Sequence, residues 1–469
     1  MAFGVVDAEG ISRAARIAAE YQLKGHKLVV VVSAFPNVTD ELASISERAV
    51  EGNLEIMNEF VERHLRHHIN AATECIRDQI IQRKVVDEIN ENSLELRGIL
   101  RSIARLRELT PRSKDFVLSF GERLSAPVLW GAAAELGLKS EWFTGGDAGI
   151  TTDENFGEAN PLMEMTVRKV RAKLDTMLDD VKLPIVAGRG AASPHGVTTT
   201  LGRGGSDYTA TLIAASLDAD EVLIWKDMGG FMTADPSIEP DARLIQRISY
   251  AEAVEMAYFG AKAIHPRALQ PVMEKQIPVR MRSSFDLATE GTLIGGDREV
   301  KTGVVVKAVT LVGTVAVISV TGTGMAGLPG VAAKVFKVLG DAGINILMIS
   351  QSSSEAGISF VVPREKLHQA KNALGLGLIG TEFQIASEDD VCVVAAVGAG
   401  MRGTPGVAAR VFRAVAEKGV NVRMIAQGSS ELNISFIVSE MDGPKAIQAI
   451  HEEFKLGGDL AKGVSGVED

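Results

Sequence analysis

The segment Gly330–Phe336, GVAAKVF, recurs almost unchanged as Gly406–Phe412, GVAARVF, and this repetition decides how the last third of the chain folds. The match extends from residues 315–360 to residues 391–436 at a constant offset of 76. An internal repeat of this size indicates two copies of one small module that pack against each other.

Each copy has an order of apolar runs and turns that predicts its topology. In the first copy, residues 315–320 form an apolar run, a Pro-Gly turn at 329–330 precedes an apolar stripe with helical spacing, and the runs 344–349 and 358–362 follow. This order predicts a βαββαβ unit, the ferredoxin-like topology. The module resembles the ACT domain, which implies that an amino acid binds at its Gly-rich first turn. A repeated module with a purely structural role would show the same pattern.

The second copy lacks a candidate for its last strand. Residues 382–386 provide that strand in the first copy, whereas the tail 455–469 is Gly-rich and has no β run. We expect the apolar run before the first copy to supply the missing strand, so that the modules interlock. The predicted boundaries are 313–387 for the first module and 388–469 for the second, which strand 303–311 completes.

Length and composition are those of an ordinary globular protein. The chain has 469 residues, of which 46% are hydrophobic and 23% charged, and this length suits about three domains. The net charge of −11 argues against a nucleic-acid partner. Two cysteines, Cys75 and Cys392, cannot build a disulfide framework, which favours a reducing compartment. With no signal peptide and no apolar run of about 18 residues, we expect a cytoplasmic protein without a membrane partner.

Residues 1–300 read as one α/β domain with a mostly parallel sheet. Lys27–Ser33, KLVVVVS, is a continuous apolar run of the kind found in parallel strands that are covered on both faces. Residues 39–110 have helical periodicity and predict a helical subdomain. From Phe116 onward, runs such as 183–187 and 221–225 alternate with helical segments, which predicts an α/β sandwich.

Two segments of this domain have the residue types of an anion site. Thr200–Ala210, TLGRGGSDYTA, is a Gly-rich turn that leads into a helix and contains Arg203 and Asp207. Backbone amides at a helix start, beside a guanidinium, suit a phosphate or a carboxylate, although a Gly-rich turn alone is a weak signal. Ser119–Arg123, SFGER, is expected to place Glu122 after a strand and at a helix start. An acid that only complements a helix dipole would explain Glu122 equally well.

Two further segments lie where ligands bind in open α/β sheets. Residues 224–236, IWKDMGGFMTADP, follow a predicted buried strand at its carboxyl end. Residues 257–266, AYFGAKAIHP, contain Lys262 and His265. We expect His265, which precedes a proline, to be structural.

Taken together, these segments resemble aspartate kinase. The SFGE segment, GRGGSDYTA, GxxTADP, AYFGAKxxHP and the doubled ACT tail occur in that family's order over nearly the whole chain. The resemblance implies a three-layer amino acid kinase sandwich over residues 1–300, followed by two ACT domains. It also implies transfer of the γ-phosphoryl group of ATP, with Mg²⁺, to the β-carboxylate of L-aspartate. The product is 4-phospho-L-aspartate, the first step toward lysine, threonine and methionine.

The resemblance also implies a role for each matched residue. Glu122 would hold the amino group of aspartate and Arg203 a carboxylate. The implied substrate-binding residues are Ser33, Thr39, Glu122, Arg203 and Ser206. The implied catalytic residues are Gly4, Asp207 and Lys262. The implied nucleotide-binding residues are Lys226, Asp227, Met232 and Lys262. The implied allosteric residues are Met325, Gly327, Gly330, Asn345, Gln351 and Asn421. No metal ligand from the protein is expected.

The chain departs from the family at its phosphate-facing cations. The family opens with KFGGTSV, whereas this chain opens with Met1–Asp7, MAFGVVD, so Ala2 stands at the lysine position and the strand that leads into the loop is missing. Ser237 replaces the family's arginine after the Asp-Pro pair. Loss of one such cation typically costs about 3 kcal/mol of transition-state stabilisation. Arg189 and Lys226 are candidate replacements, unless both point into solvent.

Two functions therefore remain open. One is an ATP-dependent aspartate kinase under feedback by lysine or threonine. The other is a catalytically weak or inactive paralogue that acts as an amino-acid-sensing regulatory subunit. In both cases the open sheet edge of an ACT unit predicts a homo-oligomer, a dimer or larger, formed through the ACT domains.

Overall fold

The computed structural model describes residues 1–4, 7–261, 263–296, 304–322, 329–352, 357–378 and 383–458. The chain divides into two compact units, one of Met1–Gly230 with Ile264–Glu299 and one of Phe231–Ala263 with Val300–Asp469. This division differs from a boundary at residue 300, because it assigns residues 231–263 to the unit that contains the repeat. The domain boundaries drawn from the sequence stay predictions.

The first unit is built on a mostly parallel sheet, as the sequence predicts. Its strands lie in the order β3 (Ser140–Thr144), β4 (Leu183–Ala187), β2 (Val30–Val32), β1 (Ala2–Phe3), β7 (Val222–Lys226), β9 (Val279–Ser283) and β10 (Thr292–Gly295). Neighbouring strands are parallel except for β10, which runs antiparallel to β9. A separate antiparallel pair consists of β5 (Gly190–Ala192) and β6 (Thr198–Thr200). The parallel order brings the carboxyl ends of β4, β2, β1 and β7 to one edge of the sheet.

The expectation that the first strand is missing was wrong. Ala2 pairs with Val31 on one side and with Ile224 on the other, so β1 lies between β2 and β7. Gly4 extends this pairing by donating its amide to the Trp225 carbonyl at 2.9 Å. A strand of two residues is too short to produce a periodic signal in the sequence, which is why the pattern did not indicate it.

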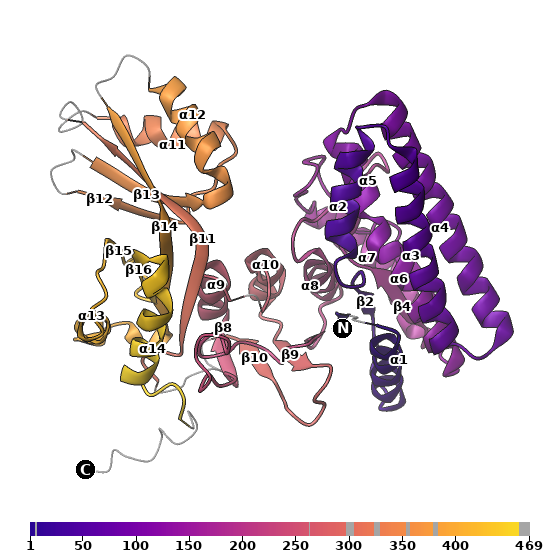
Figure 1. Cartoon of the computed structure of the whole chain (residues 1–469). Helices are drawn as coiled ribbons and strands as arrows, with labels where there is room; N and C mark the ends of the chain where they lie inside the picture. The colour runs from indigo at the N-terminus through magenta and orange to yellow at the C-terminus, as the bar shows by residue number, and fades with distance from the viewer. Residues whose placement is uncertain are drawn as a thin grey trace, which may run out of the picture. The chain divides into compact units, whose positions relative to one another are not determined.

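Helices of the first unit flank this sheet, and those between residues 38 and 106 occupy the stretch for which the sequence predicts helices. The helices of this unit are α1 (Ala8–Leu23), α2 (Val38–Ala49), α3 (Leu54–Cys75), α4 (Gln79–Leu106), α5 (Pro111–Leu118), α6 (Phe120–Glu135), α7 (Met163–Asp179), α8 (Gly205–Leu217) and α10 (Pro266–Lys275). Figure 1 shows α3 and α4 as two long helices that run side by side. Asn53 and Asp78 cap them, each accepting two backbone amides of the first turn. The apolar faces of α1 to α4 and α6 share one buried core with β2 and β4.

Glu122 does not follow a strand, contrary to the sequence-based expectation. The preceding element is helix α5, and α6 begins at Phe120, directly after it. Thr110 caps α5 by accepting the Ser113 amide, and Pro111 occupies its first turn. These are ordinary helix-start signals, and the apolar residues around Phe116 concealed them.

The second unit contains an antiparallel sheet in the order β12-β13-β11-β14-β16-β15. Its strands are β11 (Ala308–Thr321), β12 (Met348–Gln351), β13 (Gly357–Pro363), β14 (Gln384–Val397), β15 (Met424–Ala426) and β16 (Asn433–Ser439). The helices of the repeat are α11 (Val331–Asp341), α12 (Leu367–Gly377), α13 (Val407–Glu417) and α14 (Gly443–Glu453). Strand β8 (Arg247–Ser249) and helix α9 (Tyr250–Tyr258) precede the repeat in the chain. The helices and long strands of the first copy recur 76 residues later, as the repeat predicts.

The two copies share their long strands. Residues 308–312 of β11 pair with residues 393–397 of β14, and residues 315–321 of β11 pair with β13 and with the beginning of β14. The two apolar runs that the sequence suggested as separate strands are therefore one strand with an irregularity between Val312 and Val315. The strand expected at 344–349 begins only at Met348, because residues 344–347 form the connection from α11.

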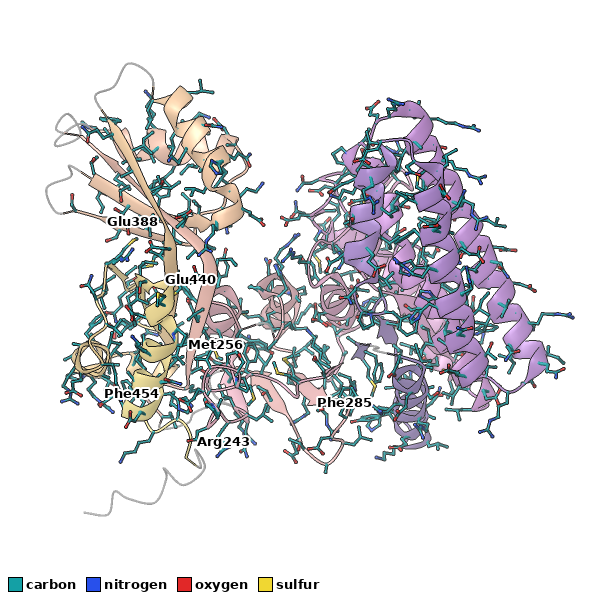
Figure 2. All side chains as sticks on the ribbon, in the orientation of Figure 1. Arg243, Met256, Phe285, Glu388, Glu440 and Phe454 are labelled. Atoms are coloured by element: carbon teal, nitrogen blue, oxygen red, sulfur yellow. The ribbon has the colours of Figure 1, made fainter. Side chains whose placement is uncertain are left out.

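Each copy has its own apolar core, and an ion pair joins the copies. Phe360 lies in the core of the first copy and Phe436, at the same repeat position, in the core of the second. Arg364 Nη2 pairs at 2.7 Å with Oε2 of Glu440, which is labelled in Figure 2 and occupies the same repeat position as Arg364. In the parts of the chain that the structure describes, no helix combines the length and apolarity needed to cross a membrane.

Candidate active site

A cavity of about 200 Å³, here called the inner cavity, lies at the carboxyl edge of the parallel sheet of the first unit. Ser33 follows β2, Arg189 follows β4, and Lys226 is the last residue of β7. Because these strands are parallel, their ends place the three side chains at one edge. The inner cavity is lined by Ser33, Ala34, Thr39, Glu122, Arg189, Gly204, Gly205, Ser206, Asp207 and Lys226.

The Gly-rich turn of TLGRGGSD forms one wall of the inner cavity. Gly204 has φ +68° and is the N-cap of α8, so the turn needs a residue that adopts left-handed backbone without strain. At Gly205, a Cβ would lie 2.9 Å from the Arg189 Cα, so glycine permits the close approach of the two loops. The first residues of α8 line the inner cavity, where the positive end of the helix dipole favours an anion.

Glu122 is a buried carboxylate in this cavity, with 2% of its surface exposed. Its Oε1 lies 3.4 Å from Arg189 Nε and 3.4 Å from Ser206 Oγ. Its Oε2 has no hydrogen-bond partner among the described residues. Burial raises the pKa of Glu122 above its ordinary value, and the Arg189 guanidinium and the nearby backbone amides of Glu122 and Ala34 oppose that rise. A buried, half-satisfied carboxylate is costly, which points to a ligand that donates to it.

Lys226 and Asp207, which also line the inner cavity, form an ion pair. The distance from Lys226 Nζ to Asp207 Oδ2 is 2.8 Å, and Asp207 is buried in the first turn of α8. The alternative that Arg189 and Lys226 both point into solvent is wrong, because both side chains line the inner cavity and bind its carboxylates.

A second cavity, of about 480 Å³ and here called the outer cavity, shares Arg189 with the first. Arg203 lines the outer cavity and is not among the residues that line the inner one. Asp115 of α5 lines the outer cavity and connects two segments of its lining. Its carboxylate accepts hydrogen bonds from the amides of Gly157 (3.0 Å) and Thr200 (2.8 Å) and from the Thr200 hydroxyl (2.7 Å). Burial raises the pKa of Asp115, and these hydrogen bonds oppose the rise. No sequence pattern indicated Asp115, which resembles any acid on an amphipathic helix.

His265 has a structural position, as expected from the proline that follows it. It is the N-cap of α10, and its Nδ1 accepts the Arg267 amide at 3.3 Å. A Cβ atom on Gly204 would lie only 2.5 Å from the Cβ of His265, so a larger residue does not fit at position 204. His265 thus packs against the Gly-rich turn, and burial lowers its pKa.

Gly4, Asp227 and Met232, which the resemblance also implies, are not among the residues that line the inner cavity. Gly4 is bound to Trp225, and the exposed Asp227 accepts the amide of Met228 at 2.8 Å. Met232 belongs to the second unit, where it packs on the core of the second copy. Lys262, Met325 and Gly327 lie outside the described residues. The roles assigned to all of these stay predictions.

The candidate effector residues are distributed over the two copies. Gly330 (φ +91°) caps α11 and Gly406 (φ +86°) caps α13, so both Gly-rich turns end in the same conformation. Asn345 and Asn421 are exposed and precede β12 and β15. Gln351, at the end of β12, lines a polar cavity of about 390 Å³ together with serine hydroxyls and Arg423.

No set of three or more His, Cys, Asp or Glu side chains within the described ranges is arranged to hold a metal ion.

The sequence matches the amino acid kinase family over residues 4–283 and the ACT domain over residues 318–375 and 394–454. It is 36% identical over 407 residues to the aspartokinase of Corynebacterium glutamicum, a match that covers 85% of this chain and 93% of that one. It is 33% identical over 448 residues to the chloroplastic bifunctional aspartokinase/homoserine dehydrogenase 2 of Arabidopsis thaliana, covering 93% of this chain and 48% of the relative. The chain thus spans about half the length of such bifunctional relatives.

The chain is also similar to solved structures of an aspartokinase. Escherichia coli aspartokinase III in complex with aspartate and ADP superposes with a TM-score of 0.79 at 26% identity, covering 96% of this chain and 98% of that one. The same enzyme in complex with lysine and aspartate superposes with a TM-score of 0.72 at 26% identity, covering 97% and 98%.

Proposed function

Because the chain belongs to the aspartokinases of the amino acid kinase family, we propose that it transfers the γ-phosphoryl group of ATP to the β-carboxylate of L-aspartate. The product is 4-phospho-L-aspartate, an acyl phosphate, and ADP is released. The complex of E. coli aspartokinase III with aspartate and ADP supports this choice of substrates.

One observation carries the proposal, namely the unpaired Oε2 of the buried Glu122. An acceptor in this position selects a ligand with a positive charge and hydrogen-bond donors, and an ammonium group has both. The nearby anion-binding elements, the α8 amides and the two arginines, select negative groups. A small zwitterion with a second carboxylate, such as aspartate, combines these features.

The two cavities suggest how aspartate is oriented. In this proposal its ammonium group donates to Glu122 Oε2 in the inner cavity, and its α-carboxylate lies toward Arg203 and the outer cavity. The β-carboxylate then faces the amides at the start of α8, beside Ser206 and Asp207. Arg189, which lines both cavities, neutralises charge between the two halves of the ligand.

The chemistry proposed here asks the protein to align two anions. An oxygen of the β-carboxylate attacks the γ-phosphorus, a new O–P bond forms, and the bond to the bridging oxygen breaks so that ADP leaves with that electron pair. Catalysis of this kind depends on positioning and on stabilisation of negative charge, and it needs no covalent enzyme intermediate. Mg²⁺ on the nucleotide would supply additional charge neutralisation.

Regulation is proposed through the ACT copies. An aspartate-family amino acid, lysine or threonine, binds the first copy near Gly330, Asn345 and Gln351 and inhibits the reaction. The lysine complex of E. coli aspartokinase III supports an effector of this class. Ile349 on β12 and Ile425 on β15, at the same repeat position, are each 47% exposed on edge strands. Such edges favour association of chains, so the protein is proposed to be a homodimer or larger.

The test is formation of an acyl phosphate. The purified chain is incubated with ATP, Mg²⁺ and one acid at a time, and hydroxylamine traps the product as a hydroxamate. We expect product with L-aspartate and little or none with L-glutamate or N-acetyl-L-glutamate. Absence of product with L-aspartate from a folded protein would instead favour a regulatory paralogue without kinase activity, and preference for another acid would contradict the assignment of the substrate.

A further inference from the structure

Two cationic side chains line the inner cavity among the described residues, Arg189 and Lys226. They enter from different strands of the sheet, because Arg189 follows β4 and Lys226 ends β7. Phosphoryl transfer develops charge on the oxygens of the moving group, and a cation placed there accounts for a large part of catalysis. The contacts of the two side chains indicate which one can lie beside the transferring phosphoryl group.

Arg189 contacts Glu122, the residue that is proposed to bind the amino group of aspartate. Its Nε lies 3.4 Å from the buried Glu122, and its backbone is held in left-handed conformation (φ +63°) between two loops. Its amide donates to Thr209 Oγ1 at 3.1 Å, and its carbonyl accepts the Leu201 amide at 3.0 Å. Movement of this guanidinium toward a phosphate would leave the Glu122 carboxylate buried without its cation.

Lys226 lies at the start of α8, where it pairs with Asp207 and not with Glu122. Its Nζ lies 2.8 Å from Oδ2 of Asp207, in the first turn of α8, and the residues of this turn line the cavity. The register of β1 and β7 pairs Ala2 with Ile224 and Phe3 with Trp225, so Lys226 continues β7 beside Gly4, just past the end of β1. Ala2 and Gly4 themselves offer no charged side chain, and Lys226 on the neighbouring strand brings an ammonium group to this edge of the sheet.

We propose that Lys226 is a catalytic cation of this chain and that its Nζ binds the transferring phosphoryl group, held in position by Asp207. This inference rests on the proposed kinase function, and it names the residue that takes over the charge missing at Ala2. A lysine suits this task because its compact ammonium group follows a moving phosphoryl group without the fixed geometry of a guanidinium.

The first test compares two lysines that have the same kind of partner. Lys226→Met is expected to lower kcat for acyl phosphate formation by about 10²- to 10³-fold and to change KM for aspartate by less than about threefold. Lys275→Met is the control, because Lys275 Nζ also lies 2.8 Å from an aspartate, Asp218, outside both cavities. The control should keep both constants. Unchanged kcat in Lys226→Met would overturn the proposal.

The second test needs no turnover and separates this proposal from the kinase function itself. Affinities for ADP and for the non-hydrolysable analogue adenylyl imidodiphosphate, both with Mg²⁺, are measured by calorimetry. Lys226→Met should lose roughly tenfold or more of the preference for the triphosphate, since one charge-assisted contact is worth that much. Equal weakening of both nucleotides would indicate a structural ion pair and overturn the proposal. If the unmodified protein forms no acyl phosphate, the proposed function fails, but the triphosphate preference still decides the role of Lys226.

A third variant guards against misfolding. Lys226→Arg keeps the charge and the pairing with Asp207, and it should retain a larger part of kcat and of the triphosphate preference than Lys226→Met does. Equal behaviour of the arginine and methionine variants, at unchanged melting temperature, would contradict a role for the charge.

Discussion

Arg189 Nε lies 3.4 Å from Oε1 of Glu122, and this contact joins the loop after β4 to the first turn of α6. It leaves Oε2 of the same carboxylate without a partner among the described residues. The pair therefore holds a buried negative charge beside the inner cavity and leaves one carboxylate oxygen without a hydrogen bond. The proposed binding of the aspartate ammonium group depends on this arrangement.

Acidification is expected to weaken aspartate binding through Glu122. Burial raises the pKa of Glu122, so its carboxylate gains a proton at a higher pH than an ordinary glutamate does. The ionised form accepts the ammonium group, and it is present above the raised pKa and lost as the pH falls through it. KM for aspartate should therefore rise on acidification in the unmodified protein. In Glu122→Gln it should be high at every pH, and an identical pH profile in both proteins would contradict the assignment.

Restoring a lysine at the start of the chain is expected to rescue the loss of Lys226. Replacement of residues 1–6 by a KFGGTSV-type segment brings a lysine to the position of Ala2 in β1, which pairs with β7. In Lys226→Met this replacement should raise turnover at least about tenfold, because one cation at the transferring group is worth a few kcal/mol. In the unmodified chain the gain should be much smaller. The kcat values of the four proteins check this, and a large gain in the unmodified chain together with no rescue would show that Lys226 does not supply the charge.

The buried pair Lys307–Glu252 is expected to be a major determinant of the stability of the second unit. Glu252 Oε2 accepts from Lys307 Nζ (2.8 Å) and the Ser249 amide (2.9 Å), and Oε1 accepts from the Ala399 amide (2.6 Å). Lys307→Met leaves a buried carboxylate without its cation, which costs roughly 3–5 kcal/mol in such cases. Lys445→Met, which removes one partner of Asp442 at the surface, should lower the free energy of unfolding far less. Denaturant unfolding of both variants checks this, and equal effects would contradict it.

Effector binding and aspartate binding are expected to oppose each other. If lysine or threonine binds the first ACT copy and favours an inactive arrangement, effector and aspartate must weaken each other by the same factor. Calorimetry measures both affinities, each with and without saturating amounts of the other ligand. Failure of every aspartate-family amino acid to bind, or binding that leaves the affinity for aspartate unchanged, would contradict the proposed regulation.

The fold could be predicted largely from the sequence because its signals are local and repeated. The 76-residue offset fixed the equivalence of Phe360 and Phe436, and the apolar run at 27–33 fixed a central parallel strand. The two-residue β1 could not be predicted, because its pairing depends on neighbours that lie far away in the sequence. The continuity of β11 was missed for a related reason, since an irregular ladder interrupts the two-residue period of the strand.

The site could be predicted in its residue types but not in its pairing. The motifs indicated Glu122, Ser206 and Asp207, and the structure brings all three into one cavity. In the structure, Arg189 pairs with Glu122 and Lys226 pairs with Asp207. These pairings depend on the strand order β4-β2-β1-β7, which no single segment of the sequence encodes.

The most direct test of the site is the comparison of L-aspartate with succinate, which is aspartate without its amino group. Binding of each is measured by calorimetry for the unmodified chain and for Glu122→Gln, with Glu95→Gln, a glutamate paired with Arg123 outside both cavities, as the control. The account predicts that the unmodified chain and the control prefer aspartate over succinate by roughly tenfold or more, since a charge-assisted hydrogen bond is worth about 1.5–3 kcal/mol. It also predicts that Glu122→Gln loses most of this preference and still binds ATP. Equal preference in all three proteins, or a parallel loss of aspartate and ATP binding in Glu122→Gln, would contradict it.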